Sequence, residues 1–167
     1  MQSAEMTSEH PIAHKIVAVL TEHKYWYKTF EHAMVRTSED AALVRPGYSL
    51  EQGAKALIVR LKIPNEGKRF VMLVMPAHQK FDASKVKALT GSKDIRFATE
   101  SEVESITDGV KPGGVPPFGN LFSLPVLADG TLFDQDKIIF NAGRTVSIAM
   151  KSADYKKLVQ PLIASII

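Results

Sequence analysis

One nine-residue segment sets the tightest limit on how the backbone of this chain can run. Residues 111–119 read Lys-Pro-Gly-Gly-Val-Pro-Pro-Phe-Gly, so three prolines and three glycines stand close together. Proline fixes its own φ and lacks an N–H donor, whereas glycine reaches conformations closed to other residues and admits close neighbours. The segment is therefore predicted to be a rigid loop, either a tight crossover turn or the wall of a binding site.

Length and composition favour one compact domain. The chain has 167 residues and no cysteine, and a chain of this length buries about two thirds of the surface that its unfolded form exposes. We expect a single domain over residues 1–167, with residues 1–8 as a flexible N-terminus. The lack of cysteine excludes disulfides, thiolate catalysis and zinc sites built on sulfur.

Apolar runs and charge bear on location and partners. The longest apolar runs, such as residues 71–75, are too short to span a bilayer, and no secretory signal opens the chain. We therefore expect a cytoplasmic protein that binds no membrane. The net charge of +3 could help a polyanion approach. Basic residues of the middle third form either a phosphate-binding face or an ordinary solvated surface. They are Lys62, Lys68, Arg69, Lys80, Lys85, Lys87, Lys93 and Arg96.

Apolar spacing and capping residues predict the secondary structure. Helices are expected over residues 10–24, 37–42, 83–89 and 99–106, and from residue 152 onward. Their predicted caps are Thr37 with Ser38, Asp82, Thr99 with Glu102, and Ser152, and Pro161 should kink or split the last helix. Strands are expected over residues 25–32, 54–62, 69–75, 95–98, 124–127, 137–140 and 144–150, with a hairpin turn at 64–67. This irregular interleaving favours an α+β fold with a mixed sheet.

Lys55 is the first candidate functional residue. In a strand over residues 54–62 it shares one face with Leu57, Val59 and Leu61, because successive side chains alternate. If that face is buried, Lys55 is its only charge and must be paired, solvated in a pocket or shifted in protonation. Alternatively, Lys55 lies at the frayed start of the strand and reaches water through its long side chain.

Other catalytic patterns find little support. His10 and His14 lie four residues apart, but no catalytic carboxylate stands between them. No serine stands in a nucleophile elbow, and no phosphate-loop pattern occurs. We therefore expect neither a metal ion nor another cofactor. Phe30, Phe97 and Phe118 are candidates for stacking on a base or for ordinary core positions.

Five segments occur in the order of one known family. They are Thr-Ser-Glu-Asp-Ala-Ala at 37–42, Ala-Lys-Ala-Leu-Ile-Val at 54–59, Ile-Arg-Phe-Ala-Thr-Glu-Ser-Glu-Val at 95–103, Gly-Gly-Val-Pro-Pro-Phe-Gly at 113–119 and Phe-Asn-Ala-Gly-Arg at 140–144. With these segments the chain resembles the YbaK-type aminoacyl-tRNA deacylases, relatives of the editing domain of bacterial prolyl-tRNA synthetases. The resemblance implies a compact α+β domain with a mixed, barrel-like sheet surrounded by helices. It also implies metal-independent hydrolysis of the ester between a wrong amino acid and the 3′ end of a tRNA.

The resemblance assigns roles by position. The functional lysine of the family falls on Lys55, and its Gly-x-x-x-Pro loop falls on residues 113–117. Ala56 replaces a threonine that is frequent in the family, which bears on substrate preference. The expected oxyanion donors are the N–H groups of Gly113, Gly114 and Val115. The expected pocket residues are Pro116, Pro117, Phe118 and Gly143, and the expected tRNA phosphate contacts are Lys80, Arg96 and Arg144.

Two functions remain open from the sequence. The chain is either a free-standing deacylase acting in trans on mischarged aminoacyl-tRNA, or a non-catalytic module that binds tRNA or amino acids and docks on a synthetase. DNA is not an expected partner. Retention of Lys55 and of the glycine-proline loop favours the enzyme. By analogy with the family, a hydroxyl of the substrate's own ribose helps to activate the attacking water. Alanine, cysteine and serine cannot be ranked as the amino acid removed, because such small differences are worth only about 1 to 3 kcal/mol.

Overall fold

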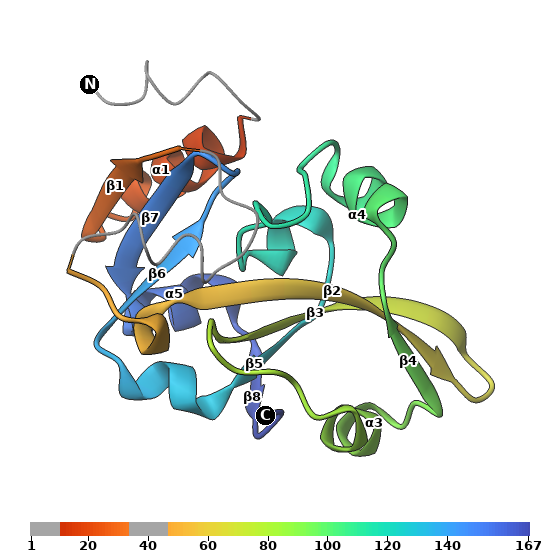
Figure 1. Cartoon of the computed structure of the whole chain (residues 1–167). Coiled ribbons are helices and arrows are strands. Elements are labelled where there is room, and N and C mark those ends of the chain that lie inside the picture. Colours follow the sequence, from red (N-terminus) through yellow and green to blue (C-terminus); the bar gives the residue numbers. More distant parts are fainter. Residues whose placement is uncertain (1–10, 34–46) are drawn as a thin grey trace.

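The structure, a computed structural model, describes residues 11–33 and 47–167. The flexible N-terminus expected over residues 1–8 and the short helix expected over residues 37–42 lie outside the described residues. Within the described ranges the strands form two sheets, one with five strands and one with three. Figure 1 shows how the chain passes between them.

The five-stranded sheet is built on one long hairpin. Strands β2 (Ala54–Ile63) and β3 (Gly67–Pro76) pair antiparallel without a break in register, as the sequence predicted. Strand β4 (Asp94–Phe97) pairs antiparallel with the outer half of β2. On the other side, β5 (Val126–Asp129) and β8 (Leu162–Ala164) extend the sheet in parallel pairing. The predicted mixed sheet is therefore confirmed.

The three-stranded sheet is antiparallel throughout. Its order is β1 (Tyr27–Glu31), β7 (Val146–Lys151) and β6 (Lys137–Asn141). A single parallel bridge between Gly53 and Ile139 joins it to the start of β2. The described strands thus form two linked sheets rather than one closed barrel, a difference from the barrel-like sheet that the resemblance implied.

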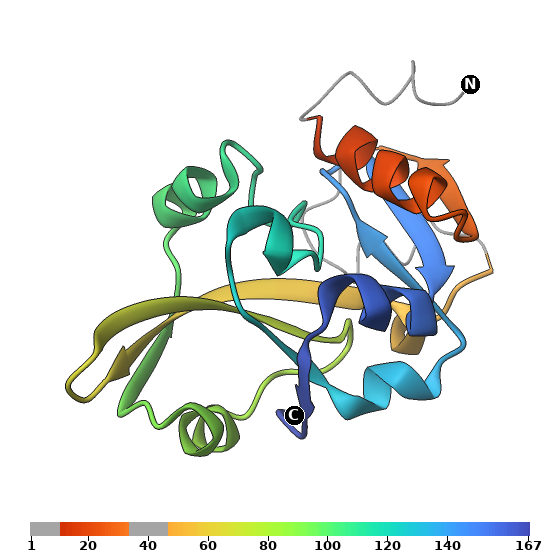
Figure 2. The same ribbon diagram turned by 180° about the vertical axis from the view of Figure 1, so that it is seen from behind.

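Helices cover both sheets. Helix α1 (Ile12–Glu22) buries Ile12, Ile16 and Leu20 in the core that also holds the inner face of the three-stranded sheet. Figure 2 shows this helix lying along that sheet from behind. The others are α3 (Ala83–Thr90), α4 (Glu100–Thr107) and α5 (Ser152–Val159), with short 3-10 helices η2 (Leu50–Gln52), η3 (Gly119–Phe122) and η4 (Gly130–Asp134). Each described helix is too short or too polar to cross a bilayer.

Two predicted helix caps are confirmed. The Asp82 side chain accepts hydrogen bonds from the N–H groups of Ser84 and Lys85, and Thr99 with Glu102 forms a reciprocal capping box at the start of α4. Each cap satisfies N–H groups that have no partner inside the helix. These caps fix where the chain turns away from β3 and β4.

The β2–β3 hairpin separates two hydrophobic cores. The loop-side core holds Ala54 and Ile58 of β2 together with Val115 and Phe118. The α3-side core holds Val59 and Leu61 of β2 together with Val86 of α3, among others. Figure 1 shows the same separation, with the 111–119 segment and η3 on one side of the hairpin and α3 on the other. Both faces of β2 are therefore packed.

The C-terminal segment differs from the prediction. Helix α5 ends at Val159, Gln160 adopts a left-handed conformation, and Leu162 begins a strand instead of continuing an apolar helical stripe. Pro161 lacks the N–H that another helical turn needs, and pairing with β5 satisfies the chain beyond it. Ser152 does not cap the helix, because its hydroxyl donates to the carbonyl oxygen of Gln135.

Candidate functional site

The proline- and glycine-rich loop is tied to the turn between β6 and β7. The N–H of Gly143 donates to the carbonyl oxygen of Gly114 (2.7 Å), and the Asn141 side-chain amide donates to that of Gly113 (2.7 Å). The Arg144 guanidinium donates through Nε to the carbonyl oxygen of Pro112 (3.1 Å). Three consecutive loop carbonyls are thus held by one turn, which makes the predicted rigid loop a feature of the tertiary structure.

Tyr155 of α5 holds the second half of the loop. Its side chain is fully buried, and its hydroxyl donates to the carbonyl oxygen of Pro117 (2.6 Å). Burial raises the pKa of the Tyr155 hydroxyl, so the group stays protonated and remains a donor. Phe118 packs edge-to-face on the same ring and also contacts Phe140. The end of the loop is therefore anchored in the core.

Gly114 allows the loop and the turn to approach each other closely. A Cβ atom at this position would lie 2.8 Å from the carbonyl carbon of Gly143 and 3.0 Å from the nitrogen of Arg144. Both neighbours are backbone atoms, which cannot rotate away as the end of a side chain can. Gly113 has a φ of +89°, and Gly143 has a φ of +90°, conformations that favour glycine.

A cavity of about 120 Å³ lies between the loop and the edge of β2. Its lining is apolar and consists of Ala56, Leu57, Ile58, Phe97, Ala98, Val103, Pro112, Gly113 and Val115. Strand β4 pairs with β2 only from Val59 to Lys62. No described strand covers the earlier part of this edge of β2, which is where the loop approaches it. The early end of β4 therefore creates the cavity.

The edge of β2 supplies main-chain polar groups to this cavity. The N–H of Ala98 donates to the carbonyl oxygen of Ile58 (2.9 Å), which shows that Ile58 turns its main-chain groups toward β4. Main-chain groups of residues two apart in a strand point to the same side. Ala56 consequently presents its N–H and carbonyl oxygen at the same edge, beyond the end of β4.

Lys55 lies at the start of β2, one residue before the cavity lining. Its side chain is half-buried and leaves the strand on the face of Leu57 and Val59, opposite Met75 of β3. The prediction that Lys55 shares a face with Leu57 and Val59 is confirmed, because β2 has no bulge that would shift the alternation of its side chains. The loop packs on the other face, with Ala54 and Ile58, so Lys55 and the loop lie on opposite faces of β2.

The expected donor set changes in one place. The N–H of Gly114 donates to the carbonyl oxygen of Lys111 (3.0 Å), so this glycine shapes the loop and its N–H is not available for an oxyanion. Among the described residues, the N–H groups of Gly113 and Val115 donate to no carbonyl or side chain. Both residues line the cavity. The three expected donors therefore reduce to two.

The four expected pocket residues lie behind the cavity. Pro116, Pro117, Phe118 and Gly143 are all buried, and the structure places them in the support of the loop. The side chains that hold this support, Asn141 and Tyr155, were not selected from the sequence. A tyrosine on the apolar stripe of the last helix was the available signal, because a buried hydroxyl needs a hydrogen-bond partner.

Two of the three expected phosphate contacts already have partners within the fold. Arg96 forms a two-pronged ion pair with Glu102 (2.9 and 3.1 Å) and also donates to the carbonyl oxygen of Phe97. Arg144 braces the loop through Pro112. Lys80 is exposed beyond the end of β3, and its neighbour Phe81 packs in the α3-side core. The structure thus gives the two arginines structural contacts and leaves Lys80 exposed, so the phosphate contacts stay a prediction.

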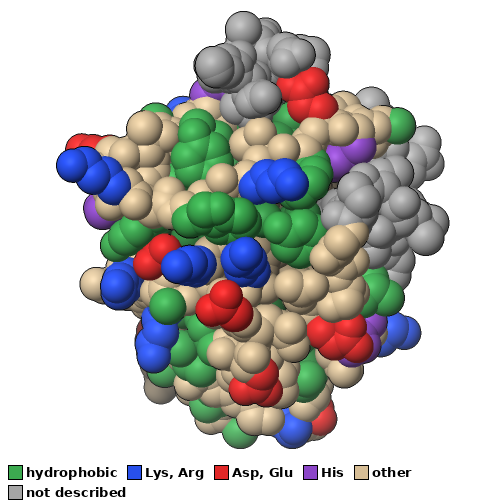
Figure 3. Space-filling model, turned by 90° about the vertical axis from the view of Figure 1, so that its left-hand side faces the viewer, with side chains coloured by type: hydrophobic (Ala, Val, Ile, Leu, Met, Phe, Trp, Pro, Cys, Tyr) green, Lys and Arg blue, Asp and Glu red, His purple; other side chains and the backbone are tan. Residues whose placement is uncertain are grey.

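The side of the molecule formed by β1 carries cations on aromatic rings. The ammonium of Lys137 lies 4.4 Å from the centre of the Trp26 ring, and that of Lys28 lies 5.2 Å from the centre of the Phe30 ring. Figure 3 views this side and shows lysine or arginine side chains next to hydrophobic ones. Phe30 therefore lies on the three-stranded sheet, whereas the cavity lies beside β2 of the five-stranded sheet.

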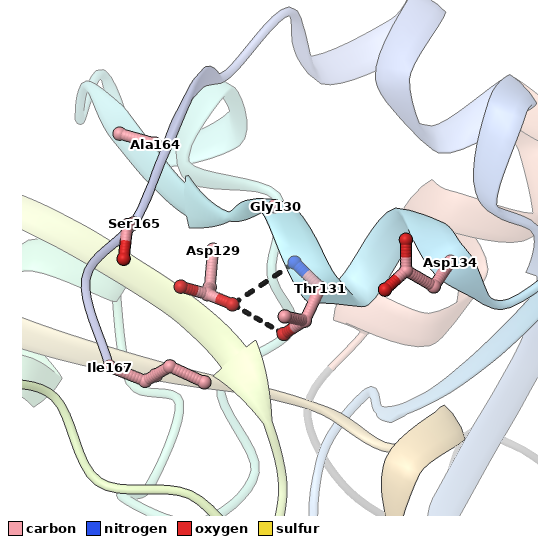
Figure 4. Close-up of a pocket in the computed structure, with 7 residues that line it drawn as sticks. All are labelled: Asp129, Gly130, Thr131, Asp134, Ala164, Ser165 and Ile167. Carbon is pink, nitrogen blue, oxygen red and sulfur yellow. Dashed lines mark hydrogen bonds between the residues drawn. The ribbon is translucent and has the colours of Figure 1, made fainter.

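A second cavity of about 320 Å³ lies near the last residues of the chain, as Figure 4 shows. Asp129 at its floor accepts hydrogen bonds from the N–H and hydroxyl of Thr131 and from the N–H of Ile166. Burial opposes ionisation of Asp129, but these hydrogen bonds outweigh it and lower the pKa of the carboxyl. The carboxylate fastens the segment after β8 to η4, which is a structural role.

No metal centre can be assigned in the part of the chain that the structure describes. No group of three or more histidine, aspartate or glutamate side chains is placed there to hold an ion. The side chains that line the cavity are all apolar, so the described lining holds none of the carboxylate or imidazole ligands that divalent metals take from proteins.

Replacing Glu102 by glutamine is expected to lower stability near neutral pH and to matter less in acid. Hydrogen bonds from Arg96 and from the N–H of Thr99 lower the pKa of Glu102 from 4.5 to about 2. Because the folded pKa lies below the unfolded one, the carboxylate stabilises the fold above pH 4.5 and loses that effect as the pH falls toward 2. Both side chains are about one-third exposed, so solvent screening keeps the effect modest.

Urea titrations of wild type and Glu102→Gln at a series of pH values from neutral downward measure this difference. The gap in unfolding free energy should be constant at neutral pH and narrow progressively below pH 4.5. A gap that stays constant into acid would show that the ion pair contributes nothing.

Comparisons with known proteins were consistent with this geometry. A model of the aminoacyl-tRNA editing domain family matches residues 32–158. A crystal structure described as a "putative trans-editing enzyme for prolyl tRNA synthetase" is 24% identical, covers 95% of this chain and 98% of its own, and gives a TM-score of 0.76. A crystal structure of a hypothetical protein is 21% identical, covers 91% of this chain and 98% of its own, and gives a TM-score of 0.77. At such identities the two structures show the fold alone. No curated protein matched the chain.

Proposed function

The chain belongs to the aminoacyl-tRNA editing domain family, and from that premise we propose that it is a deacylase that hydrolyses the ester bond of mischarged tRNA in trans. One observation carries the proposal: a small cavity lies between an open strand edge and a glycine loop that the core holds rigid. The location that this activity requires is the cytoplasm, where tRNA is charged and used. An aminoacyl-tRNA synthetase is a candidate partner that would supply the mischarged product.

The loop is suited to stabilise the transition state. Ester hydrolysis passes through a tetrahedral intermediate with a negative oxygen, and each preorganised N–H donor aimed at that oxygen is worth roughly 3 to 4 kcal/mol. Gly113 and Val115 line the cavity and have N–H groups that bond to no other described group. Gly114, between them, holds the loop against Gly143. The two donors are therefore fixed before the substrate arrives.

The edge of β2 is suited to hold the aminoacyl group. The carbonyl oxygen of Ala56 can accept a hydrogen bond from the α-ammonium of the amino acid, because it lies at the open edge beside the cavity. Lys55, one residue earlier, can place its charge on the ribose or the terminal phosphate by reaching around the same edge. Both groups orient the ester and neither acts as a base.

The cavity favours a small, uncharged amino acid. Its volume of about 120 Å³ is well below the roughly 300 to 1,000 Å³ of ordinary ligand pockets. The side chains that line it are all apolar, so a charged amino acid side chain would be buried without a partner. Alanine fits both conditions, whereas a serine hydroxyl would have to share main-chain groups with the reacting ester because none of the described lining side chains is polar.

The attacking water is activated in part by a ribose hydroxyl of the substrate. The lining side chains of the cavity carry no acid or base. The α-ammonium is assigned to the carbonyl oxygen of Ala56, which leaves the ribose hydroxyl next to the ester as the substrate group that can orient and polarise the water. This assignment leaves the protein with binding, orientation and stabilisation of the oxyanion.

A deacylation assay over a panel of mischarged tRNAs tests the proposal. We expect hydrolysis of alanyl-tRNA, weaker hydrolysis of seryl-tRNA by a factor of up to about 100, and none of aspartyl- or lysyl-tRNA. An alanyl-tRNA ending in 2′-deoxyadenosine should be nearly inert. If every tRNA keeps its amino acid although the protein binds it, the non-catalytic binding module is correct instead.

A further inference from the structure

Phe97 is the most exposed large hydrophobic side chain in the described part of the molecule. It is 58% exposed, compared with 55% for Leu162, 44% for Leu89 and 39% for Trp26. Phe97 is also the one aromatic residue among those that line the cavity. Phe118, the other nearby candidate for stacking, is only 2% exposed and belongs to the core. An exposed aromatic ring in the wall of a proposed active site is available to contact a bound ligand.

The ring of Phe97 packs against a second aromatic ring, and the main chain that carries it is fixed. Phe81 contacts it edge-to-face, with 5.6 Å between ring centres and an angle of 73°. The main chain at Phe97 is fixed by pairing with Val59 of β2 and by a hydrogen bond from Arg96 to its carbonyl oxygen (2.7 Å). A ring fixed in this way loses little conformational entropy when a flat partner stacks on it.

The charges around Phe97 disfavour a phosphate at this place. Arg96 is neutralised by Glu102, and the first turn of α4 carries the carboxylates of Glu100 and Glu102. A phosphate would meet two negative groups beside one positive group that is already paired. A neutral, flat partner would meet an exposed aromatic surface and no opposing charge.

We propose that Phe97 is a stacking platform for the terminal nucleobase of the tRNA, an inference that rests on the proposed function. When the ester lies in the cavity, the terminal ribose lies at its mouth, and the base attached to that ribose lies within one nucleoside of the wall. Phe97 is the wall residue with a π surface to offer. Stacking on an aromatic side chain accepts any base, so the platform contributes affinity for the 3′ end rather than choice of tRNA.

The test combines a protein change with a substrate change. The substrates are an alanyl minihelix with an intact 3′ end and one whose last nucleotide lacks its base. Phe97→Ala should raise the KM for the intact substrate about 5- to 100-fold with little change in kcat, because stacking acts equally on the bound substrate and the transition state. Phe97→Trp should restore the KM, and Leu89→Ala, on the exposed face of α3, should leave it unchanged.

For wild type, the KM should rise by the same factor when the last nucleotide of the substrate lacks its base. With that abasic substrate, Phe97→Ala should cause no further rise in KM. If the two losses multiply, or if Phe97→Ala leaves the KM unchanged, the platform is wrong while the deacylase proposal stands. If wild type hydrolyses neither substrate, the deacylase proposal fails. The same two-by-two comparison of dissociation constants, made with amide-linked minihelices that cannot be hydrolysed, then supports or overturns the platform.

Discussion

Replacing Gly114 by alanine is expected to lower the rate of ester hydrolysis by about 100-fold or more, because a displacement of roughly 1 Å in an active site costs that much. The new methyl group would lie 2.8 Å from the carbonyl carbon of Gly143 and 3.0 Å from the nitrogen of Arg144. The loop and the turn must then separate, which weakens the hydrogen bond from Gly143 to Gly114 (2.7 Å). The donors at Gly113 and Val115 move with the loop.

The same change should reduce the free energy of unfolding by about 2 to 4 kcal/mol through overpacking and the weakened hydrogen bond. Gly130→Ala is the matched control. A Cβ at Gly130 meets only the end of the Ile163 side chain at 3.7 Å, an ordinary contact, so stability and rate should stay near those of wild type. Wild-type kinetics in Gly114→Ala would show that the position of the loop does not matter to the reaction.

Replacing Lys55 by alanine is expected to lower kcat/KM by about 100- to 1,000-fold, the range seen when one electrostatic stabiliser is removed from an active site. The charge is the single one on its face of β2, and it lies one residue from the cavity lining. Its loss should leave the fold intact, because alanine fits the half-buried start of a strand. Lys55→Arg should restore little, since a planar guanidinium does not replace a compact ammonium.

Lys62→Ala supplies the control for Lys55. It removes a lysine from the same strand at an exposed position near the hairpin end, and its rate should equal that of wild type. Thermal unfolding of both variants separates loss of activity from loss of fold. Equal rates of ester hydrolysis by Lys55→Ala and Lys62→Ala would show that Lys55 takes no part in the reaction.

Much of the fold follows from local signals in the sequence. The sequence predicts the two strands of the β2–β3 hairpin and the turn at 64–67, and the structure confirms them with antiparallel pairing. The caps at Asp82 and at Thr99 with Glu102 are equally local, because each side chain bonds to N–H groups two or three residues away. Such features need no knowledge of distant residues.

The parts that could not be predicted depend on residues far apart in the chain. The 111–119 loop looked rigid from its own composition, but its hydrogen bonds come from Asn141, Arg144 and Tyr155. The N–H of Gly114 was expected to face the substrate. The structure shows instead that it donates to the carbonyl oxygen of Lys111. Pro161 ends α5 and leads into β8, because β5 offers a free edge there.

The candidate cations show the same limit. Arg96 and Arg144 stood out as positive residues in a basic chain, yet each is engaged by a partner on another element. Net charge and spacing along the sequence do not show which cations are already paired. The choice of Lys55 rested on strand parity, which folding preserves as long as the strand is regular.

The most direct test of the central claim is the single-turnover hydrolysis of an alanyl-tRNA by excess wild-type protein. If the cavity between the β2 edge and the braced loop is an ester-hydrolysing site, free alanine should appear many times faster than in buffer alone, and Gly130→Ala should match wild type. If the alanine stays on the tRNA at the spontaneous rate while the complex is fully formed, the chain is a binding module and the cavity is not catalytic.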